Sequence, residues 1–203
     1  MNKILCHLSF LILFLLTATN ASAAEPQGEI TLKGEILPWS LTAAAFGISF
    51  ALDRTGPWPS HPLIGGETDK RYHQDMVPGY WLYAGAGLMT GFISLVPNRE
   101  GFLNRTSYVN VKGYVQAMAF TVLSTGITKN LFGRKRPSCD NFPSGEKEKD
   151  GRKSFVSGHT SNAFCTATYG SLFIWYHVGE NRGPWRKGGK ILAAAGLHSL
   201  AGW

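Results

Sequence analysis

The sequence reads Lys129-Asn-Leu-Phe-Gly-Arg-Lys-Arg-Pro137 where one apolar stretch ends, and Ser154-Phe-Val-Ser-Gly-His-Thr-Ser161 just before the next begins. Both apolar stretches have the length of helices and lack the alternation of strands. The pattern therefore predicts a helix, a polar loop and a second helix. Proline disfavours helical backbone at the residue before it, so we expect the first helix to end at Arg136. Basic residues at one helix end and a small turn at the next helix start are suited to bind phosphate.

Five such apolar stretches follow the N-terminal region, and they predict an all-α bundle of at least five helices. They are Ile36–Leu52, Tyr80–Val96, Gly113–Thr128, Ala163–Val178 and Ile191–Trp203. Their lengths, about 13 to 17 residues, lie at or below the ~20 residues of an upright membrane span. A transmembrane bundle and a water-soluble bundle both fit this pattern.

The composition fits one domain with anionic partners. Apolar residues make up 44% of the 203 residues, charged residues 16%, and the formal net charge is +7. A basic balance of this size favours phosphate esters, acidic lipid headgroups or nucleic acid as partners.

The first 23 residues have the pattern of a secretory signal peptide. Lys3 precedes an apolar run, Ile4–Ala18, and Ala21-Ser-Ala23 offers a small-x-small cleavage site. We expect a mature domain of residues 24–203 that is exported to the cell envelope. An uncleaved signal anchor is the alternative.

Cysteine and histidine usage predicts no metal site. Only Cys139 and Cys165 remain after the signal peptide, and they fit either a disulfide or two inert thiols. No cysteine or histidine pair has the spacing of zinc ligands.

Two motifs together resemble the type 2 phosphatidic acid phosphatase (PAP2) and haloperoxidase superfamily. Lys129 followed after six residues by Arg136-Pro137 matches its first signature, K-x6-R-P. The segment Ser157-Gly158-His159, with Phe155 and Thr160 around it, matches the second. Val156 stands where the family usually has proline, so we expect a slightly looser turn. Phe142-Pro-Ser-Gly145 keeps that proline but continues with Glu146, so it is not the motif.

The family's third signature, S-R-x5-H-x3-D, is not found. His198 is the last histidine, but Leu192 and Gly202 stand where arginine and aspartate would be. The resemblance therefore implies a chain truncated before this motif, with five of about six core helices, the nucleophilic histidine beyond Trp203, and no activity of its own.

The resemblance implies a metal-independent phosphatase of the all-α PAP2 type without cofactors. Lys129 and Arg136 would bind the phosphate oxygens, Ser157 and Gly158 would complete the phosphate site, and His159 would be the catalytic acid. Implied substrates are phosphomonoesters or pyrophosphates, above all lipid phosphates such as phosphatidate or undecaprenyl pyrophosphate. Membrane association is implied, and a nucleic-acid partner is not.

Other interpretations remain open at this point. A soluble periplasmic acid phosphatase of broad specificity would carry the same motifs. Vanadate haloperoxidases share the phosphate site, but they are usually much longer chains. A non-catalytic binder of acidic lipid headgroups is the alternative from another class of protein. The resemblance favours a periplasm-facing protein, either membrane-associated or in the inner membrane.

Overall fold

The computed structural model describes residues 30–58, 80–96, 100–136, 151–179 and 184–202. The chain divides into two compact units, residues 1–40 and 41–203. In the first unit, the described residues contain the beginning of one long helix, which starts at Leu32. The second unit contains the rest of that helix and the other helices. The predicted signal peptide, residues 1–23, lies outside the described residues.

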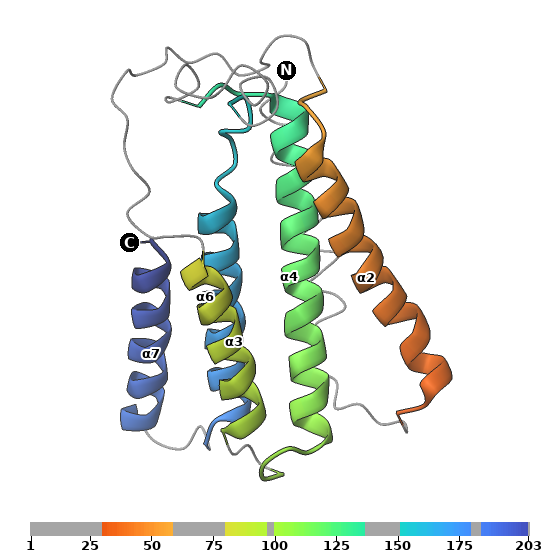
Figure 1. Ribbon diagram of the computed structural model, residues 1–203. Helices are drawn as coiled ribbons and strands as arrows, with labels where there is room; N and C mark the ends of the chain where they lie inside the picture. The colour runs from red at the N-terminus through yellow and green to blue at the C-terminus, as the bar shows by residue number, and fades with distance from the viewer. Residues whose placement is uncertain (1–29, 59–79, 97–99, 137–150, 180–183, 203) are drawn as a thin grey trace, which may run out of the picture. The chain divides into compact units, whose positions relative to one another are not determined.

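The described residues form helices and no strand, so the predicted all-α fold is confirmed. Figure 1 shows the helices, with a colour that runs from red to blue along the chain. They are α2 (Leu32–Arg54), α3 (Tyr80–Leu95), α4 (Arg105–Phe132), α6 (Gly158–His177) and α7 (Pro184–Gly202).

Four of these helices are longer than the apolar stretches that predict them. Helix α2 has 23 residues, α4 has 28, α6 has 20 and α7 has 19. The difference arises because polar residues form the first turns. At the start of α4, for example, Asn104 accepts a hydrogen bond from the amide of Ser107 at 2.9 Å. Such a cap satisfies a backbone donor that the helix itself leaves unpaired.

Helix α6 packs against α3, α4 and α7, and α3 also packs against α4. Met89, Ile93, Tyr114 and Phe173 form the buried cluster between α3, α4 and α6. The ring of Phe92 meets that of Phe173 edge-on at 5.6 Å, a favourable aromatic arrangement. This packing determines where α6 begins relative to the end of α4.

Polar contacts fix how α4 and α6 face each other. The Tyr114 hydroxyl lies 2.9 Å from Thr166 Oγ1, and the Tyr169 hydroxyl donates to the carbonyl of Asn110 at 2.8 Å. Burial raises the pKa of Tyr169 to about 12, so its phenol remains a donor at neutral pH. Gly113 lies directly against the Tyr169 hydroxyl. The absence of a side chain there lets the two helices approach closely.

We expect Gly113→Ala to destabilise the fold. A Cβ at this position would overlap the Tyr169 hydroxyl oxygen. Overlap of this kind costs about 1–3 kcal/mol, which exceeds the gain of up to ~1 kcal/mol from replacing a helical glycine. Denaturant unfolding should show the loss, and adding Tyr169→Phe should recover part of it. Gly196→Ala, which enters open space in α7, is the control and should stabilise. Equal stabilisation by both alanines would contradict the close approach.

Helix α2 is the one described helix that is long and apolar enough, by length and composition, to cross a membrane. Several of its apolar side chains are exposed, among them Leu41, Phe46, Ile48 and Phe50. A signal sequence near the N-terminus would have the same properties.

In α6, Cys165 carries a free thiol, and burial raises its pKa. Cys139, with which Cys165 would form the disulfide that the sequence leaves open, lies outside the described residues.

Candidate functional site

The residues of the two motifs lie where α4 ends and α6 begins. Lys129 is in the last turn of α4, and Arg136 follows that helix outside regular secondary structure. Ser157 caps α6, and Gly158 and His159 are its first residues. The structure therefore places four of the five predicted site residues at helix ends, and Arg136 four residues after the end of α4.

The end of α4 differs from the prediction. The helix ends at Phe132, four residues before Arg136, because Gly133 adopts left-handed backbone with φ of 57°. The Gly133 amide donates to the Lys129 carbonyl at 3.1 Å, as is usual when glycine ends a helix. The expectation that the helix ends at Arg136 because of Pro137 is therefore wrong. Arg136 is instead part of the connection that follows the helix.

The two motifs meet at Lys129 and Gly158. A Cβ built on Gly158 would lie 3.3 Å from Lys129 Nζ and 3.9 Å from the Thr125 methyl group. The ammonium group of the first motif therefore lies against the backbone of the second. Glycine permits this approach, whereas a side chain at position 158 would press on the ammonium group. A cation beside the first turn of a helix is a suitable environment for an oxyanion.

Backbone hydrogen bonds hold the connection after α4 against the segment that leads into α6. The Arg136 amide donates to the Gly151 carbonyl at 2.6 Å, and the Ser154 amide donates to the Arg134 carbonyl at 3.0 Å. The ring of Phe132 meets the ring of Phe155 edge-on at 5.5 Å. Arg136 and the start of α6 are thereby connected, although 20 residues separate Arg136 from Ser157.

The N-terminus of α6 is capped by Ser157. Its hydroxyl oxygen accepts from the Thr160 amide at 3.3 Å, and its carbonyl accepts from the Ser161 amide at 3.0 Å. The hydroxyl proton of Ser157 remains able to donate to a ligand. The first amides of a helix have no acceptor within the helix, so those of Gly158 and His159 can donate to an anion. The His159 side chain is exposed.

The guanidinium of Arg136 has a buried atom without an internal partner. Its Nε is buried, and no acceptor within the described residues forms a hydrogen bond with it. A buried donor left unpaired is unfavourable, and a bound phosphate oxygen would satisfy it. This observation fits a ligand-binding role for Arg136, which stays a prediction.

The sequence analysis did not identify a role for two polar residues near these motifs, Asn130 and Lys153. Asn130 is 1% exposed and Lys153 is 3% exposed. Both donate to backbone carbonyls at the end of α2, about 80 to 100 residues earlier in the chain. A contact over that separation leaves no local pattern in the sequence.

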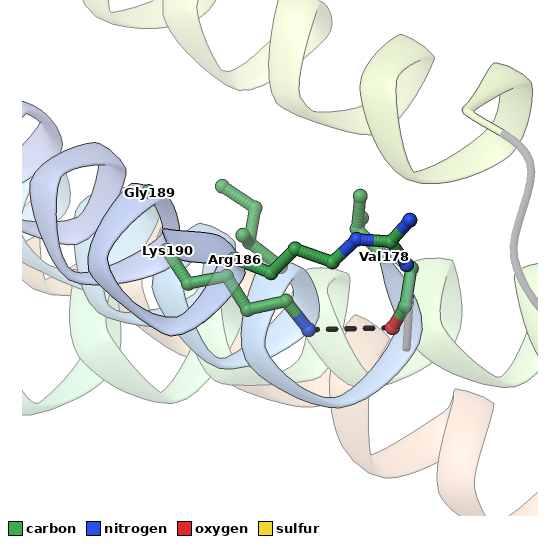
Figure 2. A pocket seen from close by; sticks show the side chains of 6 residues that line it. Val178, Arg186, Gly189 and Lys190 are labelled. Atoms are coloured by element: carbon green, nitrogen blue, oxygen red, sulfur yellow. Dashed lines mark hydrogen bonds between the residues drawn. The ribbon is translucent and has the colours of Figure 1, made fainter. Parts of the chain in front are cut away.

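A separate cavity of about 410 Å³ lies between the end of α6 and the start of α7. Figure 2 shows it, with Arg186 and Lys190 among the side chains that line it. The Lys190 ammonium group donates to the carbonyls of Trp175 at 2.9 Å and Gly179 at 3.4 Å. It therefore caps the C-terminus of α6. None of the predicted site residues lines this cavity.

Within the described ranges, no group of three or more histidine, cysteine, aspartate or glutamate side chains is placed to hold a metal ion. The groups brought together at the junction of α4 and α6 are instead cations, a hydroxyl, helix amides and an imidazole. These groups are of the kinds that bind an oxyanion, and a site of this kind stays a prediction.

A family model described as the PAP2 superfamily matches residues 110–201. The matched range includes both motifs and supports membership of this superfamily. Members are in general phosphatases, so membership supports a phosphatase activity in the broad sense. Comparison with curated proteins and with solved structures gave no match.

Proposed function

We propose that the protein is a metal-independent phosphatase that hydrolyses phosphomonoesters or pyrophosphates, with lipid phosphates such as phosphatidate or undecaprenyl pyrophosphate as substrates. The observation that carries the proposal is the position of Lys129 Nζ against Gly158, 3.3 Å from where a Cβ would lie. It brings a cation of the first motif to the helix N-terminus that the second motif forms. A phosphate group is the ligand whose charge and oxygens match both.

Binding and charge stabilisation would come from fixed groups. Lys129 and Arg136 bind the non-bridging oxygens, and the amides of Gly158 and His159 add donors at the positive end of the α6 dipole. The Ser157 hydroxyl donates as well. Charge-assisted hydrogen bonds to phosphate are about twice as strong as neutral ones, so these groups stabilise the charge that develops during transfer.

The reaction would proceed in two steps. A histidine nitrogen attacks phosphorus and forms a P–N bond while the P–O bond to the leaving group breaks, and His159 donates a proton to the leaving oxygen. Water then attacks phosphorus, the P–N bond breaks, and His159 takes up a proton from the water. The attacking histidine would be that of the family's third motif.

Lipid substrates are supported by the character of α2. Its apolar side chains are exposed along much of the helix, and its length is sufficient to cross a bilayer. The C-terminal end of α2 is hydrogen-bonded to Asn130, the residue after Lys129. An enzyme held at a membrane in this way would meet phosphate groups at the bilayer surface. We propose a periplasm-facing location in the cell envelope for the domain from residue 24 onward.

We expect the protein expressed from its complete reading frame to release phosphate from phosphatidate and from p-nitrophenyl phosphate in excess EDTA. Fixed cations take the place of a metal in the proposed site, so chelation should leave the rate unchanged. The chain that ends at Trp203 should bind phosphate without releasing it from esters. Phosphate release can be measured with a colorimetric assay.

The same assay separates the alternatives. Loss of activity on chelation would overturn the metal-independent mechanism. Hydrolysis of p-nitrophenyl phosphate without hydrolysis of phosphatidate would favour an acid phosphatase for small esters. Binding of phosphatidate vesicles by the full-length protein, without phosphate release, would favour a binder of acidic lipid headgroups.

A further inference from the structure

A buried lysine, Lys153, lies behind the candidate site and bonds to the end of α2. Its side chain is 3% exposed. Its Nζ donates to the carbonyl of Asp53 at 2.6 Å and to that of Leu52 at 3.3 Å. These carbonyls belong to the last turn of α2, where the helix dipole is negative and carbonyls lack partners within the helix. A buried ammonium group is tolerated only with such acceptors, so the contact holds both partners in place.

Asn130 fastens the same helix end to α4. Its side-chain amide donates to the Leu52 carbonyl at 3.1 Å and to the Gly126 carbonyl at 2.9 Å. Its own backbone carbonyl accepts from the Trp58 amide at 2.9 Å. The end of α2 is therefore bonded both to the residue next to Lys129 and to Lys153, and both residues donate to the Leu52 carbonyl.

From Lys153 the connection to the site is short. The next residue, Ser154, donates its amide to the Arg134 carbonyl, and Gly151 accepts from the Arg136 amide. Three residues further along the chain, Ser157 begins the first turn of α6. Segment 151–154 therefore lies between the end of α2 and the connection that carries Arg136. A shift of this segment would move both Arg136 and the start of α6.

We propose that Lys153 is a positioning residue for the phosphate site, and this inference rests on the proposed function. Lys153 bonds segment 151–154 to the end of α2. It thereby fixes the distance between Arg136 and the first turn of α6. It does not contact substrate itself. Displacing a binding group by about 1 Å can lower a rate about 100-fold, so an anchor of this kind can matter as much as a direct contact.

A lysine that only caps a helix, without positioning the site, would make the same hydrogen bonds. The chain contains a second buried lysine of this kind, which serves for comparison. Lys190 is also buried, 8% exposed, and donates to the carbonyls of Trp175 and Gly179 at the end of α6. Figure 2 shows the bond to Gly179. It lies at the far end of α6 from Ser157, away from the predicted site residues. Lys190→Met is therefore the control for the loss of a buried, helix-capping ammonium group.

The test compares Lys153→Met with Lys190→Met in the protein expressed from its complete reading frame. Both variants should unfold at a lower temperature than the parent. At a temperature where all are folded, Lys153→Met should bind inorganic phosphate about 10- to 100-fold more weakly, and its kcat/KM for p-nitrophenyl phosphate should fall at least as much. Lys190→Met should retain both values. Lys153→Arg keeps a cation with several donors and should recover part of the affinity.

Each outcome decides the proposal. Equal phosphate affinity of Lys153→Met and Lys190→Met would show that Lys153 only caps α2, and would overturn the positioning role. If Lys153→Met does not fold, Lys153→Gln replaces the ammonium group with a shorter, uncharged amide that weakens the contact with α2. Phosphate affinity in that variant equal to that of Lys190→Gln would overturn the role equally. A parent protein that neither binds nor releases phosphate would instead remove the proposed function, independently of the Lys153 variants.

Discussion

Replacing His159 by alanine in the full-length protein is expected to lower kcat by about 10²–10⁴ while changing phosphate affinity little. His159 is the second residue of α6 and is exposed, next to the glycine that Lys129 approaches. Its imidazole would protonate the leaving oxygen, an interaction that matters in the transition state and not in the bound phosphate. A residue of this kind changes kcat more than it changes affinity.

The leaving group provides the sharper measurement. An alkyl phosphate needs a proton on its leaving oxygen, whereas p-nitrophenolate leaves without one, so His159→Ala should affect the alkyl ester far more. Equal losses for both esters would show that His159 is not the general acid. His177→Ala is a suitable control, because His177 lies at the other end of α6 with its ring 5.3 Å from that of Phe173. That variant should retain kcat for both esters.

The helical character of the fold was predictable from the sequence, and the helix ends were not. Long apolar stretches without alternation are sufficient to predict helices. Their ends depend on single residues that a search for apolar stretches passes over. Asn104 caps α4 several residues before its apolar part, and the left-handed Gly133 ends it before Pro137. Four of the five predicted helices were therefore too short, and α2 reaches 23 residues, enough by length to cross a membrane.

The two motifs of the candidate site were predictable from the sequence. How the two motifs contact each other in space was not. Spacing within each motif indicates which residues bind phosphate in the family. It does not indicate that Lys129 Nζ lies against Gly158, because that contact depends on how α4 packs along α6. The packing in turn depends on pairs such as Tyr114 with Thr166, which are 52 residues apart. Lys153 was missed for the same reason, since its partners are about 100 residues earlier.

Replacing Arg136 by alanine is expected to weaken phosphate and vanadate binding by about ten- to a hundredfold, and turnover with it. The guanidinium would contact the phosphate in both the bound state and the transition state. A charge-assisted bond of this kind contributes about 1.5–3 kcal/mol. The loss should therefore appear in affinity, measured by titration with vanadate, whereas the loss in His159→Ala should not. Arg136→Lys should recover little, because an ammonium group lacks the planar, fixed pair of donors with which a guanidinium binds two phosphate oxygens.

A variant of the neighbouring Lys135 can show whether Arg136 contacts the phosphate directly or only adds to the local positive potential. Lys135 is exposed and carries the same charge one residue earlier in the chain. If Arg136 acts only by raising the local positive potential, Lys135→Ala should weaken vanadate binding to a similar degree, and added salt should remove the effect of both substitutions. If Arg136 binds the phosphate directly, Lys135→Ala should have a small, salt-sensitive effect, and the loss in Arg136→Ala should persist at high salt. The Nε of Arg136 is buried and has no acceptor among the described residues, which favours the second result, because a partly buried donor is screened less than an exposed one.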